Sequence, residues 1–163
     1  MRVGLPCFLL LAVSMPALAA DCNAPAEPKV DWQRCYLDGR NLSEHRLAGA
    51  RLREASFQRT DLTRADLSGV DGYRARFVSA TMAGARLDEG GFAEADFTKA
   101  DLSGASMKGA DLRRTKFFRA NLRGADLTGA KTLGADLLNA ELSGARWTDG
   151  ERICEEGSVG QCN

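Results

Sequence analysis

A large apolar residue recurs at every fifth position of this chain, and no other feature restricts its fold so strongly. From Leu37 to Trp147 this position occurs 23 times without an insertion, and 21 of the 23 residues are Leu, Phe, Met or Trp. The exceptions are Gly72 and Thr132. The residue two positions before the large apolar residue is Ala in 16 of the 23 units. A helix repeats near 3.6 residues and a strand at 2, so neither element alone produces a period of five.

A five-residue unit is too short to enclose a core, so the units must be stacked by a larger repeat. If four units make one square turn, equivalent residues recur every 20 positions, and the central residues sort into four faces. The first face has Leu37, Phe57, Phe77, Phe97, Phe117 and Leu137, the second begins at Leu42, the third at Leu47, and the fourth has Leu52, Gly72, Phe92, Leu112 and Thr132. The phenylalanines gather on the first face and both exceptions fall on the fourth, which supports this register.

Polar residues sort by the same register. Two positions after the centre, the fourth face reads Glu54, Arg74, Glu94 and Arg114; one position before the centre, the first face reads Arg76, Asp96, Lys116 and Asp136. Stacked strands lie about 4.8 Å apart, so both columns are expected to form ladders of opposite charges. Glycine gathers two positions after the centre on the second and third faces, which predicts a different corner geometry on those faces.

Runs such as Ala65-Asp66-Leu67-Ser68-Gly69 and Ala100-Asp101-Leu102-Ser103-Gly104 resemble the pentapeptide-repeat family over residues 36–149. The resemblance implies an all-β fold, a right-handed quadrilateral parallel β-helix of nearly six coils. It also implies that the central residue and the small residue before it point inwards.

Residues 1–19 have the features of a signal peptide, with Arg2, an apolar stretch and Ala17-Leu18-Ala19 before the cleavage site. The alternative, a membrane anchor, needs about 20 predominantly apolar residues, and this stretch is shorter. We therefore expect a periplasmic or secreted protein with no integral membrane segment after cleavage. The mature chain has 21 basic and 22 acidic residues, a balance that argues against a nucleic-acid-binding surface.

Four cysteines remain after cleavage: Cys22, Cys35, Cys154 and Cys162. In an oxidising compartment they favour disulfides over metal ligands, because neither spacing is C-x-x-C. A stack of nearly six coils places Cys35 and Cys154 beyond bonding reach, so we expect Cys22 to pair with Cys35 and Cys154 with Cys162. Each bond would fasten a cap, at residues 20–35 and 150–163. Such caps favour a monomer, although family members can also pair end to end as homodimers.

The sequence contains no enzyme motif, and we expect no catalytic residue, cofactor or metal. His45 stands at a position where Ala usually points inwards, and the regularly spaced carboxylates, such as Asp61 and Asp101, are ordinary for the repeat.

The surface of the first face has apolar residues at Val78, Phe118 and Leu138, with Arg59, Lys99 and Arg119 around them. Exposed apolar residues of this kind indicate a contact surface, and we expect a protein partner. The cations around them either bind an anionic partner or only keep the face soluble. The predicted function is an exported, non-catalytic structural or protein-interaction scaffold. The alternative is the function of the best-known relatives, DNA mimicry and binding of DNA gyrase, which a nearly neutral, exported chain disfavours.

Overall fold

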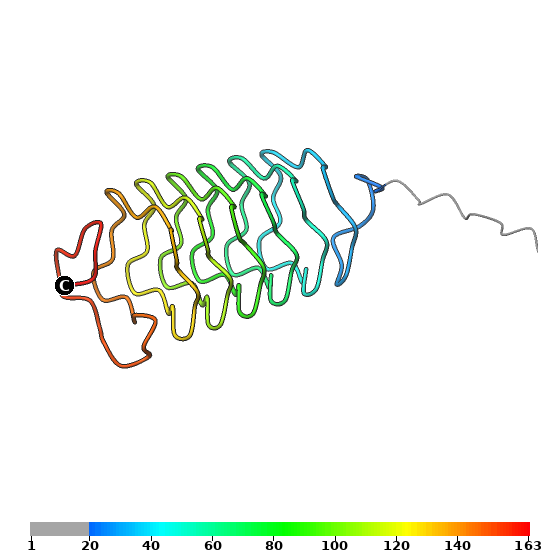
Figure 1. The fold of residues 1–163 in the computed structure, drawn as a ribbon. Helices are drawn as coiled ribbons and strands as arrows, with labels where there is room; N and C mark the ends of the chain where they lie inside the picture. The colour runs from blue at the N-terminus through cyan, green and yellow to red at the C-terminus, as the bar shows by residue number, and fades with distance from the viewer. Residues whose placement is uncertain (1–19) are drawn as a thin grey trace, which may run out of the picture.

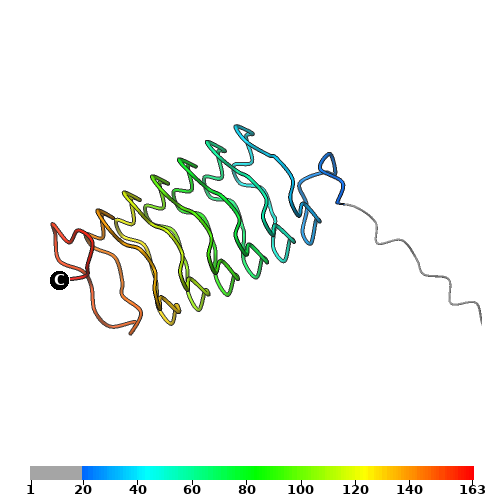
Figure 2. The same ribbon diagram turned by 45° about the horizontal axis from the view of Figure 1, so that its top comes forward.

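The computed structural model describes residues 20–163. These residues form a rod of stacked coils, with the N-terminal segment at one end and the C-terminal segment at the other (Figures 1 and 2). The predicted signal peptide, residues 1–19, lies outside the described residues.

The 20-residue period is confirmed by the backbone pairing. Twenty parallel bridges join residues 20 positions apart, from Asp31↔Arg51 to Asp126↔Arg146, in an unbroken series with a step of five. Each bridge is isolated, and no helix or longer strand occurs within residues 20–163. One side of a coil therefore contains a single paired residue, followed by its central residue and a two-residue turn.

The regular pairing begins at Asp31, so the first coil starts earlier than the repeat in the sequence indicates. Trp32 occupies the central position of that first side and is 1% exposed. Its ring lies 6.5 Å from that of Phe57. Trp32 thus packs as a core residue of the first coil.

The central residues and the small residues before them form one continuous core. On the first face the phenyl rings stack nearly parallel, with centroid separations of 5.1 Å for Phe57–Phe77, 4.8 Å for Phe77–Phe97 and 5.4 Å for Phe97–Phe117. A column of identical rings repeats at the coil spacing, so each ring buries both of its faces.

Every regular corner uses the same backbone conformation. In the turn from Leu102 to Ala105 the amide of Ala105 donates to the carbonyl of Leu102 at 3.0 Å. Gly104 has φ of 63°, as the third residue of a type II turn requires. Fourteen non-glycine residues adopt positive φ at the equivalent position, including Arg59 at 55° and Glu94 at 59°. The prediction of different corners on different pairs of faces is therefore wrong: charged residues on the first and fourth faces accept the left-handed conformation that glycine adopts elsewhere.

Asp or Asn precedes the central residue because its side chain closes the turn. The Asp61 carboxylate accepts the backbone amide of Thr63 at 2.9 Å, and Asp126 accepts that of Thr128 at 3.0 Å. Such local bonds are the usual role of Asx residues in turns.

Ser79→Gly should stabilise the rod, because Ser79 is exposed and has φ of 56°. Left-handed φ costs an L-residue roughly 1 to 2 kcal/mol, and glycine loses about 0.5 to 1 kcal/mol in chain entropy. We expect a net gain of about 0.5 to 1 kcal/mol in urea unfolding. Ser79→Ala is the control, because it should show no gain; an equal gain for both variants would contradict strain at this corner.

The carboxylates that close the turns make the stability of the fold depend on pH. Hydrogen bonds from the side chain and backbone of Thr63 lower the pKa of Asp61, and those from Ser143 lower the pKa of Glu141. A carboxyl whose pKa is lower in the folded chain stabilises it above the unfolded pKa, near 4, and loses this effect as pH falls through the folded pKa. The urea midpoint should stay level from pH 7 to about 5 and fall below about pH 4; a midpoint that rises on acidification would contradict this account.

A disulfide-linked segment lies at each end of the rod. Cys22 is bonded to Cys35 and Cys154 to Cys162, with Cα separations of 5.4 and 4.8 Å. Cys35 stands where the repeat usually has the inward Ala and is 1% exposed. At the other end the segment after Gly150 turns back and pairs with the last coil in antiparallel bridges, Glu141↔Val159 and Arg146↔Ile153.

Candidate functional site

The column of alternating charge on the fourth face forms ion pairs, as predicted. Arg34 lies 3.2 Å from Glu54, and Glu94 lies between Arg74 at 2.7 Å and Arg114 at 3.6 Å. The hydrogen bond from Arg74 lowers the pKa of Glu94. The cations of this face are thus largely neutralised by carboxylates of the same face.

The corresponding column on the first face does not form ion pairs, so that prediction is wrong. Backbone bridges join each residue of this column to the next, in the order Arg76, Asp96, Lys116 and Asp136. In the part of the chain that the structure describes, however, no ion pair within 4.0 Å joins their side chains. Asp96 instead accepts the amide of Thr98, and Asp136 that of Leu138. The carboxylates close turns, and neither cation pairs with a carboxylate: Arg76 donates instead to the Ser56 hydroxyl at 3.3 Å.

The first face therefore has an excess of free positive charge. Between residues 20 and 163, none of its five cations lies within 4.0 Å of a carboxylate. These cations are Arg59, Arg76, Lys99, Lys116 and Arg119. The first and fourth faces are adjacent and together have 12 basic and 8 acidic residues, against 7 and 9 on the other two. The rod thus has a basic side and an acidic side.

The predicted apolar residues lie within this basic side, toward the C-terminal end of the first face. Leu138 is 60% exposed, and its carbonyl accepts the amide of Arg119 at 3.1 Å. The guanidinium carbon of Arg119 lies 5.1 Å from the centre of the Phe118 ring, and Phe118 is half-buried. The structure thus brings Phe118, Arg119 and Leu138 together.

The other three predicted residues lie farther along the same face. Val78 is half-buried two coils before Phe118, with Thr98 between them, and Arg59 and Lys99 are exposed at the corner column that Arg119 continues. They extend the basic surface along the rod and add no direct contact to the apolar group.

The fourth face contains a hollow that the sequence analysis did not predict. It has a volume of about 420 Å³ and is lined by Tyr73, Ala93, Glu94, Arg113, Arg114, Leu133 and Gly134. Ala93 forms a low point because larger residues, Tyr73 and Arg113, occupy the same column one coil on either side. The Tyr73 ring is held between the guanidinium groups of Arg53 and Arg74, at 4.7 and 4.9 Å. The sequence does contain a signal for this hollow, because a small residue interrupts a column of large ones: Arg53, Tyr73, Ala93, Arg113 and Leu133.

The structure does not group His45 with other residues into a catalytic or metal-binding site. His45 is exposed, although Ala at the equivalent positions points inwards, and its Nδ1 lies 3.0 Å from the carbonyl oxygen of Ser43. Within residues 20–163, no group of three or more His, Cys, Asp or Glu side chains is placed to hold a metal ion. Nor do these residues include a helix with the length and apolar character needed to cross a membrane.

The family model described as pentapeptide repeats (8 copies) matches residues 33–69, 59–90, 75–114, 95–131 and 120–146. Together these matches cover residues 33–146. Among curated proteins no match was found.

Solved structures of the same kind are similar to this chain. A pentapeptide repeat protein from the thylakoid lumen of Arabidopsis thaliana is 21% identical with a TM-score of 0.46, over 77% of this chain and 81% of that one. HetL, involved in heterocyst differentiation regulation in the cyanobacterium Nostoc sp. strain PCC 7120, is 24% identical with a TM-score of 0.31, over 76% and 92%. Full-length QnrB1, a plasmid-mediated fluoroquinolone resistance protein, is 18% identical with a TM-score of 0.38, over 72% and 70%.

Proposed function

Because the chain belongs to the pentapeptide repeat family, we propose that it is a non-catalytic, exported scaffold whose first face binds an acidic protein partner. In this proposal the coil is the right-handed quadrilateral β-helix typical of the family. The rod holds its surface side chains at fixed spacing, so binding costs little conformational entropy.

The observation that carries the proposal is the basic first face with an apolar group near its end. Unpaired cations attract a partner of opposite charge and speed its approach. Phe118 and Leu138 supply apolar area that a partner can bury. An acidic segment with apolar residues satisfies both features, whereas the ion pairs of the fourth face leave less charge for a partner.

Two features support export. The N-terminal segment, residues 1–19, has the composition of a signal peptide. Both pairs of mature cysteines are within disulfides, which persist in oxidising compartments and are rare in the cytosol.

The charge distribution also separates this proposal from DNA mimicry. A surface that imitates DNA requires a continuous acidic stripe. The first and fourth faces have the opposite sign, and the other two faces have only a small acidic excess.

Site-specific photo-crosslinking in the producing cell tests the proposed surface. A photoreactive residue in place of Phe118 should crosslink to a distinct protein, and one in place of Ser103 on the second face should not. Arg59→Glu with Lys99→Glu should reduce the Phe118 crosslink at least threefold, because both changes oppose an acidic partner. Equal crosslinks from the two faces, or no effect of the charge reversals, would contradict the proposal.

A further inference from the structure

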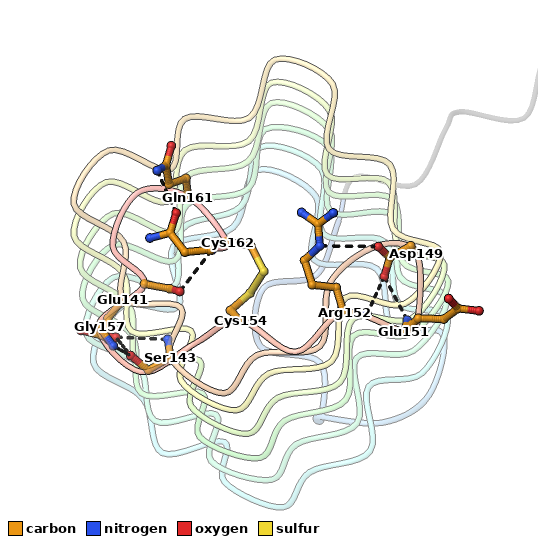
Figure 3. Close-up of a disulfide and its surroundings, with 11 residues drawn as sticks. Glu141, Ser143, Asp149, Glu151, Arg152, Cys154, Gly157, Gln161 and Cys162 are labelled. Atoms are coloured by element: carbon orange, nitrogen blue, oxygen red, sulfur yellow. Dashed lines mark hydrogen bonds and ion pairs between the residues drawn. A yellow bond between two sulfur atoms is a disulfide. The ribbon is translucent and has the colours of Figure 1, made fainter.

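The C-terminal segment covers only half of the last coil. Its backbone pairs with the second and third faces, where Leu142 donates to Ser158 and Gly144 to Cys154, both at 2.8 Å. Figure 3 shows the Cys154–Cys162 disulfide over the end of the rod, with Gly157 beside Ser143. The cover ends near Gly160, whose amide donates to Ala140 at 2.9 Å.

On the fourth and first faces, the last coil has backbone donors without acceptors. One coil earlier, the amides of Leu112, Arg114 and Phe117 donate to the carbonyls of Lys131, Leu133 and Asp136 at 2.9, 3.0 and 2.7 Å. The equivalent amides of the last coil are those of Thr132, Gly134 and Leu137. No acceptor is assigned to them within residues 20–163. We call the backbone of residues 131–138 the open edge.

The side chains at the open edge are also less covered than their counterparts. Leu112, Thr115 and Phe117 are 0% exposed, whereas Thr132, Ala135 and Leu137 at the equivalent positions are only half-buried. Leu133 beside them is 82% exposed. The unpaired amides and the reduced burial thus occur at the same place. One layer of extended chain on these two adjacent sides would pair the amides and cover the side chains. Unpaired edges of this kind are templates for strand addition.

We propose that the open edge binds an extended segment of a partner protein, which pairs in parallel as a partial seventh coil. This is recognition by added backbone pairing, in which main-chain hydrogen bonds supply affinity and side chains supply specificity. The proposal concerns a different surface from the first-face contact and does not depend on it.

The charge columns predict which segment fits. Asp111 is paired with Lys131, and Lys116 with Asp136, through the backbone. Continuing this alternation, the bound segment should place an acidic residue over Lys131 and a basic residue five positions later, over Asp136. An apolar residue should follow each of them, over Thr132 and Leu137, because these half-buried positions continue the core.

A second copy of this chain fits the open edge less well. It would bring an identical edge, whose unpaired groups comprise four amide donors, at Thr132, Gly134, Leu137 and Asn139, but only two carbonyls, at Ala130 and Ala135. A parallel segment offers one carbonyl to each donor, as residues 131–138 do to the coil before them.

Amide hydrogen exchange measured by NMR on the mature chain tests the proposal. The probe is the peptide DLRRTKFFRA, the sequence of residues 111–120, which has the required acidic and basic residues five apart. In the free chain the amides of Thr132, Gly134 and Leu137 should exchange at least tenfold faster than those of Leu112, Arg114 and Phe117. The peptide at about 1 mM, a concentration suited to weak binding, should slow the first three at least threefold.

A charge exchange provides the matched control. The peptide KLRRTDFFRA should bind about fivefold more weakly to the native chain, since two exposed pairs are reversed. Lys131→Glu with Asp136→Lys should invert that preference. Arg59→Glu with Lys99→Glu should leave the exchange effect unchanged, which separates this site from the first-face contact.

Four results would overturn the proposal. Slow exchange of the three amides in the dilute free chain would show an edge that is already covered. Protection that increases with chain concentration alone would assign the edge to a second copy. Absence of slowing by the peptide at about 1 mM, or slowing without a charge preference, would also reject an added segment in this register.

Discussion

Replacing Phe97 by Ala should lower the free energy of unfolding by about 3 to 5 kcal/mol. Phe97 is 0% exposed and lies in the middle of the first-face column. Its ring stacks on Phe77 at 4.8 Å and on Phe117 at 5.4 Å. Ala removes the ring from both contacts and leaves a cavity that the adjacent coils cannot fill, because their backbones are fixed by the bridges on either side.

Urea unfolding followed by circular dichroism measures this loss. Phe118→Ala is the control, because Phe118 follows a central residue and is half-buried on the surface; it should cost clearly less than Phe97→Ala. A loss below about 1 kcal/mol for Phe97→Ala would contradict the inward stack.

Restoring the repeat at Gly72 should destabilise the rod, although Leu is the commonest residue at this position. A Cβ atom on Gly72 would lie 2.7 Å from Cδ1 of Phe92, one coil later in the same column. Phe92 is 0% exposed and its ring also contacts Phe77 and Phe97, at 6.1 and 5.6 Å. Because Phe92 fills the space of two central residues, Gly72→Leu should cost about 3 kcal/mol by overpacking.

The second exception to the repeat supplies the control. Thr132→Leu makes the same kind of repair at a half-buried site of the last coil, so it should change stability by less than about 1 kcal/mol. Adding Phe92→Ala to Gly72→Leu should recover part of the loss. If Gly72→Leu is neutral or stabilising, Phe92 does not occupy the Gly72 site.

The sequence alone predicts the register of the fold because the repeat is local and unbroken. The period of five gives the length of one side of the coil, and the recurrence of phenylalanine every 20 residues gives the length of one full coil. The ion pairs of Glu94 follow from the same register. The length of the stack indicates which cysteines are near enough to pair.

Features that depend on space between coils were not predictable from the period. Gly72 signals a break in the sequence, but only the packed ring of Phe92 explains it. Arg59 and Glu94 show that the corner conformation is imposed by the coil and not chosen by glycine. The charges of Asp96 and Lys116 alternate as in a ladder, yet Asp96 binds a backbone amide instead.

The candidate site was predicted in part. Phe118, Arg119 and Leu138 are neighbours in the structure because the 20-residue register places Leu138 one coil beyond Phe118. The hollow near Ala93 and the open edge at residues 131–138 depend on the sizes of adjacent side chains and on the path of the C-terminal segment. Neither is encoded in the five-residue pattern.

Intact-mass measurement of the protein from fractionated cells, after thiol alkylation with and without reduction, tests the proposal of an exported scaffold most directly. The account predicts a mature chain that begins near Ala20, lies outside the cytoplasm, and gains no label until reduction exposes four thiols. An uncleaved chain in the cytoplasm whose cysteines react without reduction would contradict it.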